Sequence, residues 1–224
     1  MTDILIDYLK QFITDRRWEL FNHVINHRTR YITVVLEDIY QSQNASAVLR
    51  TCDCFGIQDV HIIENTNEFK INPDVELGAA QWLNLNLYNS TQNNTISAIN
   101  SLRNQGYRIV ATTPHTNDTD LENFDLRKGK TALFFGSEQP GLSEIMLENA
   151  DEFLKIPMFG FTESFNISVS ASIILHSLIL KLKKSDISWQ LDNLQRKEVL
   201  FNWLKYSVKD SDRIIKEYQR RNIQ

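Results

Sequence analysis

The spacing of apolar residues changes several times along the chain, and each change marks a predicted element. Apolar side chains follow a helical spacing over residues 2–29, with a break near residues 15–17, which predicts an interrupted amphipathic helix. Residues 31–37 are mostly β-branched and are bounded by charge, as is typical of a buried strand. The apolar pattern therefore switches from helix to sheet at about residue 30.

Strands and helices alternate after this switch. The pattern predicts further strands at 60–63, 83–88, 107–112, 131–135 and 153–156, with 83–88 at a sheet edge, and helices at 45–55, 96–104, 165–182, 189–207 and 210–221. Such alternation indicates an α/β fold with a mostly parallel sheet flanked by helices. We predict a core domain at 31–182, an N-terminal helical extension at 1–30 and a C-terminal helical extension at 183–224.

Composition narrows the class of protein. The chain has 224 residues, of which 42% are hydrophobic and 23% charged, so disordered and fibrous proteins are excluded. No apolar run reaches the length of a membrane-spanning helix, and the N-terminus lacks the pattern of a signal peptide. The two cysteines, Cys52 and Cys54, are too close for a useful disulfide, and no spacing suits a metal. We expect a cytoplasmic protein with no membrane segment and no metal.

Charge is distributed unevenly along the chain. The formal net charge is −4, but residues 1–30, 31–180 and 181–224 carry balances of +1, −10 and +5. Basic ends on an acidic body could hold a polyanion beside a reaction site. Charge alone favours the simpler interpretation, in which both ends form amphipathic helices with solvated basic faces.

The first of three polar clusters spans residues 44–52 and follows the first core strand, where open α/β sheets place their ligands. Asn44 can cap the following helix, and Arg50 has Asp53 at a spacing that suits an ion pair. Taken alone, a helix cap and a surface ion pair explain these residues better than a reaction site does.

The second cluster, residues 135–143, leaves the end of a strand. Gly136 and Gly141 bracket a polar loop and would allow close approach of a ligand, and Ser143 can cap the next helix. The sequence fits neither the GxGxxG motif nor the P-loop. By itself it suggests an ordinary turn between a strand and a helix.

The third cluster, residues 156–172, joins a strand to a helix rich in serine. Pro157 and Gly160 shape the loop, and Ser168 and Ser172 share one helix face. A capped helix start and serine hydroxyls bonded to the backbone are the simpler explanation.

Together the clusters resemble the SpoU (TrmH) family of SPOUT RNA methyltransferases. The shared motifs are N-x-S-A-x-x-R-T-C-D, F-G-x-E-x-x-G-x-S and I-P-M-x-G-x-x-x-S-x-N-x-S-V, and the resemblance covers about residues 16–182. It is strongest to the branch that methylates guanosine 18 of tRNA, which also has helical extensions at both ends. Phe165 and Ser170 depart from the usual Leu and Ala.

The resemblance implies a SPOUT fold with a C-terminal deep trefoil knot, a homodimer, and methyl transfer from S-adenosylmethionine to a ribose 2′-hydroxyl of tRNA. By motif position, the cofactor would contact Thr112, Thr113, Gly136, Ile156, Met158, Phe165 and Ser168. The catalytic residues would be Arg50, at the reacting hydroxyl, and Asn44, Glu138, Ser164 and Asn166.

Two roles for Arg50 follow from the resemblance. A general base would have to release a proton from a guanidinium at neutral pH, at a cost of about 7.5 kcal/mol. We therefore favour a cation that binds phosphate and stabilises the developing alkoxide, and keep the general base as the alternative.

RNA would be held by basic residues near the two ends of the chain, namely Arg16, Arg17, Arg28, Arg30, Lys183, Lys184, Arg213, Lys216, Arg220 and Arg221. Trp18, Trp189, Trp203 and Tyr218 could stack on bases, although packing between helices is the simpler role. The alternatives are a ribose methyltransferase for ribosomal RNA or another tRNA position, and a non-catalytic RNA-binding protein. A nucleotide-dependent oxidoreductase is disfavoured because GxGxxG is missing.

Overall fold

The computed structural model describes residues 2–114, 119–137 and 139–222. It divides into two compact units, residues 29–189 and residues 1–28 with 190–224. The division falls close to the boundaries expected at residues 30 and 182, but the two ends of the chain combine into one helical unit. Within the described residues, no helix combines the length and apolar character needed to cross a membrane.

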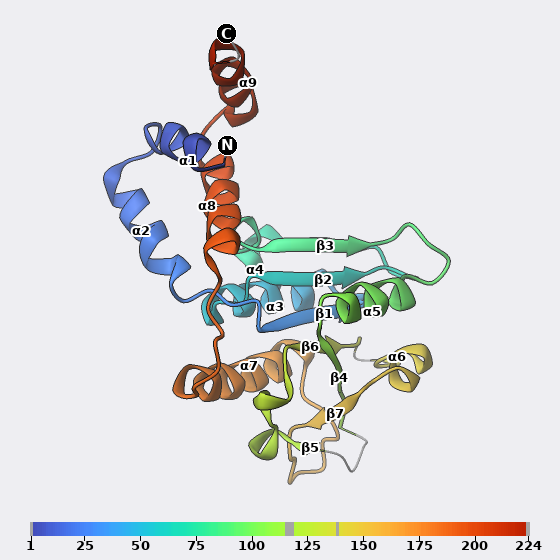
Figure 1. Cartoon of the computed structure of the whole chain (residues 1–224). Helices are drawn as coiled ribbons and strands as arrows, with labels where there is room; N and C mark the ends of the chain where they lie inside the picture. Colours follow the sequence, from blue (N-terminus) through green and yellow to red (C-terminus); the bar gives the residue numbers. More distant parts are fainter. Residues whose placement is uncertain (1, 115–118, 138, 223–224) are drawn as a thin grey trace. The chain divides into compact units, whose positions relative to one another are not determined.

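The larger unit contains a parallel seven-stranded sheet (Figure 1). Its strands are β1 (Ile32–Glu37), β2 (Asp59–Ile63), β3 (Asn84–Tyr88), β4 (Arg108–Thr112), β5 (Thr119–Asp120), β6 (Thr131–Phe135) and β7 (Glu152–Lys155). Their order is β3-β2-β1-β6-β4-β7-β5, with every pair parallel. The predicted parallel α/β class and the edge position of β3 are confirmed. The short strand β5 was not predicted.

Helices cover both faces of this sheet. They are α3 (Ser42–Phe55), α4 (Pro73–Glu76), α5 (Asn94–Asn104), α6 (Glu144–Glu148) and α7 (Ile167–Lys184), with single 3-10 turns η1 (Ala80–Trp82), η2 (Leu121–Asn123) and η3 (Leu126–Lys128). Alternate residues of β1 face opposite sides. Val34 and Leu36 share a core with α3 and α7, whereas Val35 packs with buried residues of α5 and α6.

The parallel arrangement brings the ends of four strands to one edge of the sheet. Leu36 of β1 pairs with Phe135 of β6, which places Glu37 beside Gly136. The loops after β4 and β7 leave from the same edge, because β4 pairs with both β6 and β7. This edge carries the second and third sequence clusters. The trefoil knot implied by the resemblance stays a prediction.

The helical unit consists of α1 (Thr2–Lys10), α2 (Asp15–Ile25), α8 (Asn193–Ser207) and α9 (Ser211–Asn222). Helix α8 packs on α1 and α2, and Phe21 meets the Trp203 ring edge to face at 5.4 Å between centroids. Thr14 caps α2, and Asp192 begins α8 in a capping box with Gln195. The helix break lies at residues 11–14, before the place expected near residues 15–17, which form the first turn of α2.

His61 makes the sheet sensitive to acid. It is 3% exposed on β2, and burial lowers its pKa from 6.5 to about 4. The unfolded chain binds this proton below pH 6.5, whereas the folded chain binds it only near pH 4, so acid favours unfolding. We expect the free energy of unfolding to fall by up to about 3 kcal/mol between pH 6.5 and 4.

Denaturant unfolding across this pH range, compared with His61→Phe, tests the effect. The variant should show a flatter pH dependence, and the exposed His176, changed to Gln, serves as the control. An equally steep dependence in His61→Phe would contradict the assignment.

Candidate functional site

A pocket of about 210 Å³ lies at the carboxyl ends of β4 and β6. A second pocket of about 50 Å³ adjoins it toward β7, and the two share Thr112, Thr113, Pro114, Ser164, Phe165 and Ser170. The shared walls make them two parts of one site. This is where ligands bind in open α/β sheets.

Six of the seven predicted cofactor residues line this site. Thr112, Thr113, Gly136 and Phe165 line the larger part, and Ile156 and Met158 join the lining of the smaller part. Ser168, the seventh, does not line either part. It lies on the other side of the same segment, in the groove that contains Arg50.

Hydrogen bonds fix the end of β4 between its neighbours. The Thr112 hydroxyl donates to the Phe134 carbonyl of β6 at 2.7 Å, and the Thr113 amide donates to the Leu154 carbonyl of β7 at 3.1 Å. Both threonines are therefore held on the pocket wall by long-range contacts.

Gly136 is required by a close approach of backbone. A Cβ atom at this position would overlap the carbonyl group of Gly141 and the amide nitrogen of Leu142. The loop after β6 thus folds back onto its own start, and Gly141 sits there with a φ of +92°. Only a residue without a side chain fits at position 136.

Arg50 lies in a groove of about 530 Å³ formed by α3, α4 and α7, together with Thr51, Ser168 and Ser172. The Thr51 and Ser172 hydroxyl oxygens are 3.2 Å apart, which ties α3 to α7. The guanidinium side chain is exposed.

Asn44 belongs to a polar network and does not cap α3. The helix begins at Ser42, with Gln41 as its N-cap residue, so Asn44 lies within the first turn. Its amide nitrogen donates to the Gln41 side-chain oxygen, and its own side-chain oxygen accepts from Asn166, both at 3.1 Å. The expectation of a cap is wrong because the helix begins at Ser42, before residue 45, where the apolar pattern predicts its start.

Asn166 is the N-cap of α7. Its side-chain oxygen accepts from the Ser168 amide at 2.9 Å and from the Ser168 hydroxyl at 2.6 Å. Asn166 therefore links Asn44 of the first cluster to Ser168 of the third. In this way Asn44 is brought to Asn166, which is 122 positions away in the sequence, and to its neighbour Ser168.

One short segment joins the pocket to the network. Ser164 and Phe165 line the pocket, and the adjacent Asn166 binds Asn44 on α3. A ligand in the pocket and a second ligand beside Arg50 would thus contact opposite sides of residues 164–168. Glu138, a predicted catalytic residue, lies outside the described residues.

Two of the predicted RNA contacts, Arg28 and Arg30, are not exposed on the surface of this structure. Arg28 is 2% exposed and lies over the Trp203 ring at 5.3 Å, so it packs inside the helical unit. Arg30 is paired with Asp59 at 2.9 Å, and its side chain is 15% exposed. The remaining basic candidates are exposed: Arg16, Arg17, Arg213, Lys216, Arg220 and Arg221 in the helical unit and Lys183 and Lys184 at the end of α7.

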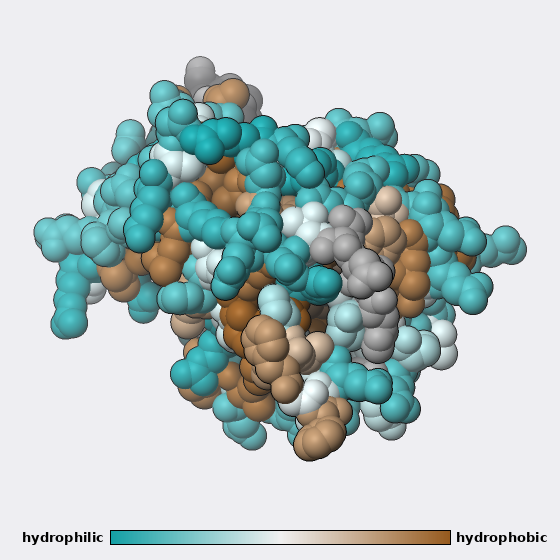
Figure 2. Space-filling view, turned by 90° about the horizontal axis from the view of Figure 1, so that it is seen from below, coloured by the Kyte–Doolittle hydropathy of each residue, from teal (hydrophilic) through white to brown (hydrophobic). Residues whose placement is uncertain are grey.

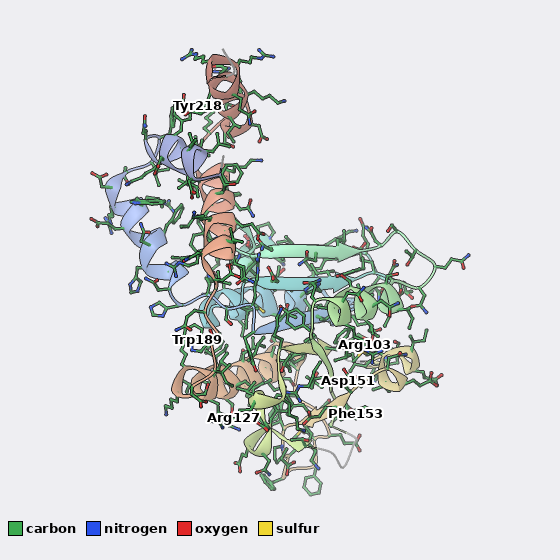
Figure 3. The ribbon with its side chains drawn as sticks, viewed as in Figure 1. Arg103, Arg127, Asp151, Phe153, Trp189 and Tyr218 are labelled. Carbon is green, nitrogen blue, oxygen red and sulfur yellow. The ribbon has the colours of Figure 1, made fainter. Side chains whose placement is uncertain are left out.

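The aromatic candidates have mixed surroundings. Trp203 is buried and packs helices, as the simpler interpretation predicts. Tyr218 lies against Tyr8 with ring centroids 4.2 Å apart, and Lys183 lies over the Trp189 ring at 5.8 Å (Figure 3). Trp18 has Lys10 over its ring at 5.0 Å.

The pocket also contains residues that the motifs do not single out as cofactor contacts. Leu154, Ile174 and Ser170 line it, and Pro140, Gly141 and Leu142 form part of its wall. Ser170 and Ile174 could have been found from the one-turn spacing that puts them on one face of α7. Leu154 could not, because the strand pattern does not show which face meets a ligand.

Comparison with known proteins shows that this chain is similar to members of one methyltransferase family. The family model described as "SpoU rRNA Methylase family" matches residues 31–176. A protein of Borreliella burgdorferi named tRNA (guanosine(18)-2′-O)-methyltransferase is 45% identical over 205 residues, which cover 92% of this chain and 92% of the relative.

Solved structures show the same fold. The Aquifex aeolicus TrmH/SpoU tRNA modifying enzyme aligns with a TM-score of 0.75 and 25% identity, covering 87% of this chain and 98% of that one. The SpoU methyltransferase AviRb from Streptomyces viridochromogenes, solved in complex with AdoMet, aligns with a TM-score of 0.56 and 18% identity, covering 73% and 62%.

Proposed function

Because this chain belongs to the SpoU rRNA methylase family, we propose that it transfers a methyl group from S-adenosylmethionine to the ribose 2′-hydroxyl of guanosine 18 in tRNA. The proposal depends on the position of residues 164–168. Ser164 and Phe165 line the pocket at the strand ends, whereas Asn166 binds Asn44 and Ser168 lines the groove that contains Arg50. Such a segment can hold a methyl donor in the pocket and a methyl acceptor in the groove, close to each other.

The lining of the pocket fits S-adenosylmethionine. Apolar side chains from Leu154, Ile156, Met158 and Phe165 can sandwich an adenine, and threonine and serine hydroxyls offer polar contacts. The two parts of the pocket share a wall, so the cofactor would occupy both. When bound, it supplies an electrophilic methyl group.

Arg50 would hold the acceptor as a cation. Its exposed guanidinium can bind a phosphate of the RNA and stabilise negative charge that develops on the ribose oxygen. The Asn44–Asn166 bond fixes α3 against the start of α7, so the guanidinium and the pocket keep a constant separation. The remaining proposed roles, for Ser164 and for Glu138, rest on motif position.

The proposal includes a homodimer. Phe159 and Phe161 are fully exposed, and Phe165 and Val169 are each 43% exposed on the segment that leads into α7. Apolar side chains are also visible on the lower face of the molecule (Figure 2). A second copy would remove such a patch from water.

Sedimentation equilibrium of the full chain tests this part of the proposal. We expect a dimer, and we expect Phe159→Ser combined with Phe161→Ser to weaken it. A monomer at micromolar concentration would contradict the homodimer.

The exposed basic residues of α2 and α9 would contact tRNA phosphates. We expect the joint replacement of Arg16, Arg17, Arg220 and Arg221 by Ala to weaken tRNA binding at least ~10-fold at physiological salt and to lower the slope of log K against log salt. Binding of S-adenosylmethionine should not change, because these residues lie outside the unit that contains the pocket.

Electrophoretic mobility shifts across a salt series measure this effect. Lys197→Ala is the matched control, since Lys197 already pairs with Asp3 at 2.8 Å in the same helical unit. Unchanged tRNA affinity and unchanged salt slope in the fourfold variant would rule out these arginines as RNA contacts.

The function itself is tested by methyl transfer from labelled S-adenosylmethionine to unmodified tRNA, followed by mapping of 2′-O-methyl positions. We expect one mark, at guanosine 18. A methyl group at another tRNA position, or transfer to ribosomal RNA alone, would show that the proposed substrate is wrong and that the proposed reaction is right. Cofactor binding without any transfer would indicate the non-catalytic alternative.

A further inference from the structure

A buried carboxylate outside the three sequence motifs contacts the wall of the pocket. Glu37, the last residue of β1, is 2% exposed. It points to the face of the sheet that α5 and α6 cover, since its hydrogen-bond partners are Thr95 of α5 and Ser143, the N-cap of α6. No basic side chain is among its hydrogen-bond or ion-pair partners within the described residues.

The two oxygens of Glu37 accept three hydrogen bonds. Oε1 accepts from the Thr95 hydroxyl at 2.6 Å and from the Ser143 hydroxyl at 2.7 Å, and Oε2 accepts from the Ser143 amide at 2.9 Å. Two of the three donors belong to Ser143. The carboxylate is therefore mainly an anchor for that one residue.

Ser143 ends the loop that forms one wall of the larger pocket. Pro140, Gly141 and Leu142 line the pocket immediately before it. At the other end of the loop, Gly136 leaves β6 next to Glu37 in the sheet register and contacts Gly141 closely. The loop is thus held at its start by β6 and at its end by Glu37.

We propose that Glu37 is a positioning residue for the cofactor. It acts through Ser143 by fixing the adjoining pocket wall at Pro140, Gly141 and Leu142. This inference rests on the proposed function for the identity of the ligand. Glu37 does not line the pocket itself, so its effect passes through the loop.

Replacing Glu37 by Gln tests the proposal, because the two side chains have nearly the same size and shape. A carboxamide has one oxygen and one NH2 group, so the oxygen can accept from the Ser143 amide only if the NH2 group takes the place of Oε1, and the Thr95 and Ser143 hydroxyls then lose their charged acceptor. We expect Glu37→Gln to raise the dissociation constant of S-adenosylmethionine and its KM about 10-fold. The affinity for tRNA and kcat at saturating cofactor should change less than about 3-fold, because Arg50 and its network lie on other elements.

Thr95→Val is the matched control. It removes a hydrogen bond to the same carboxylate from the α5 side, where no pocket residue lies. It should lower the melting temperature without weakening cofactor binding. Ser143→Ala removes the hydroxyl contact from the loop side and should reproduce part of the effect of Glu37→Gln, which keeps the test valid if that variant does not fold.

Calorimetric titration of the full chain with S-adenosylmethionine separates the outcomes. Wild-type affinity in both Glu37→Gln and Ser143→Ala would overturn the positioning role. An equal loss in Thr95→Val would also overturn it, because a general loss of stability would then explain the change. Failure of the wild-type chain to bind S-adenosylmethionine would instead overturn the proposed function.

Discussion

Arg50→Lys should lower kcat for methyl transfer by about 10²–10³-fold, the range found when a single group that stabilises developing negative charge is removed. Lysine keeps the positive charge, but its ammonium is a point charge without the planar fork that can contact a phosphate and the ribose oxygen together. The surroundings should tolerate the change, since the Arg50 side chain is exposed.

Single-turnover methylation of tRNA with saturating S-adenosylmethionine measures the effect, and tRNA affinity is measured separately. Arg127→Lys is the matched control, because Arg127 is an exposed arginine whose only ion pair among the described residues is with Asp186 at 3.0 Å (Figure 3). If Arg50→Lys turns over at nearly the wild-type rate with unchanged RNA affinity, the geometry of the guanidinium has no role in the reaction.

The same variant helps to separate the two roles of Arg50. If the cation is what matters, the pH dependence of the residual rate should stay close to that of the wild type. If Arg50 acts as a base, the Lys variant should gain rate with pH as its amine loses its proton. Rates from pH 6 to 10 provide this comparison.

Gly136→Ala should weaken cofactor binding by about 100-fold. The added Cβ would overlap backbone atoms of Gly141 and Leu142, and a backbone clash cannot be relieved by rotating a side chain. Moving the loop would cost about 3 kcal/mol, the upper end of the usual range for overpacked cores, which corresponds to a loss of affinity of about 100-fold if the loop must take its native shape to bind.

Gly160→Ala is the control for Gly136→Ala. Gly160 lies in the loop after β7, and a Cβ there would meet no neighbour closer than the Thr162 amide at 4.0 Å. Titration with S-adenosylmethionine and the melting temperature should both stay near wild type in this variant. Equal cofactor affinity in Gly136→Ala and the wild type would show that the close approach does not shape the pocket.

The sequence by itself determined the type and order of most elements. The β-branched run at 31–37 and the helical spacing at 45–55 are local patterns, and each became the element that its period predicts, β1 and α3. Caps that depend on adjacent residues could also be foreseen. Ser143 caps α6, and Gly56 ends α3 in the left-handed conformation.

Much of the candidate site was also visible in the sequence. Parallel strands place their carboxyl ends at one edge, so residues that follow β4, β6 and β7 had to meet there. Thr113, Gly136 and Ile156 do so. What the motifs left open was which side of each segment faces the pocket.

The tertiary structure alone decided the remaining contacts, because each joins residues far apart in the chain. Asn44 binds Asn166 across 122 positions, so its role in a network could not be separated from a local cap by spacing. Arg28 packs on Trp203 of α8, which turned an expected RNA contact into a core residue. Glu37 looks like the polar end of a strand in the sequence, and only the fold brings Ser143, 106 positions away, to its carboxylate.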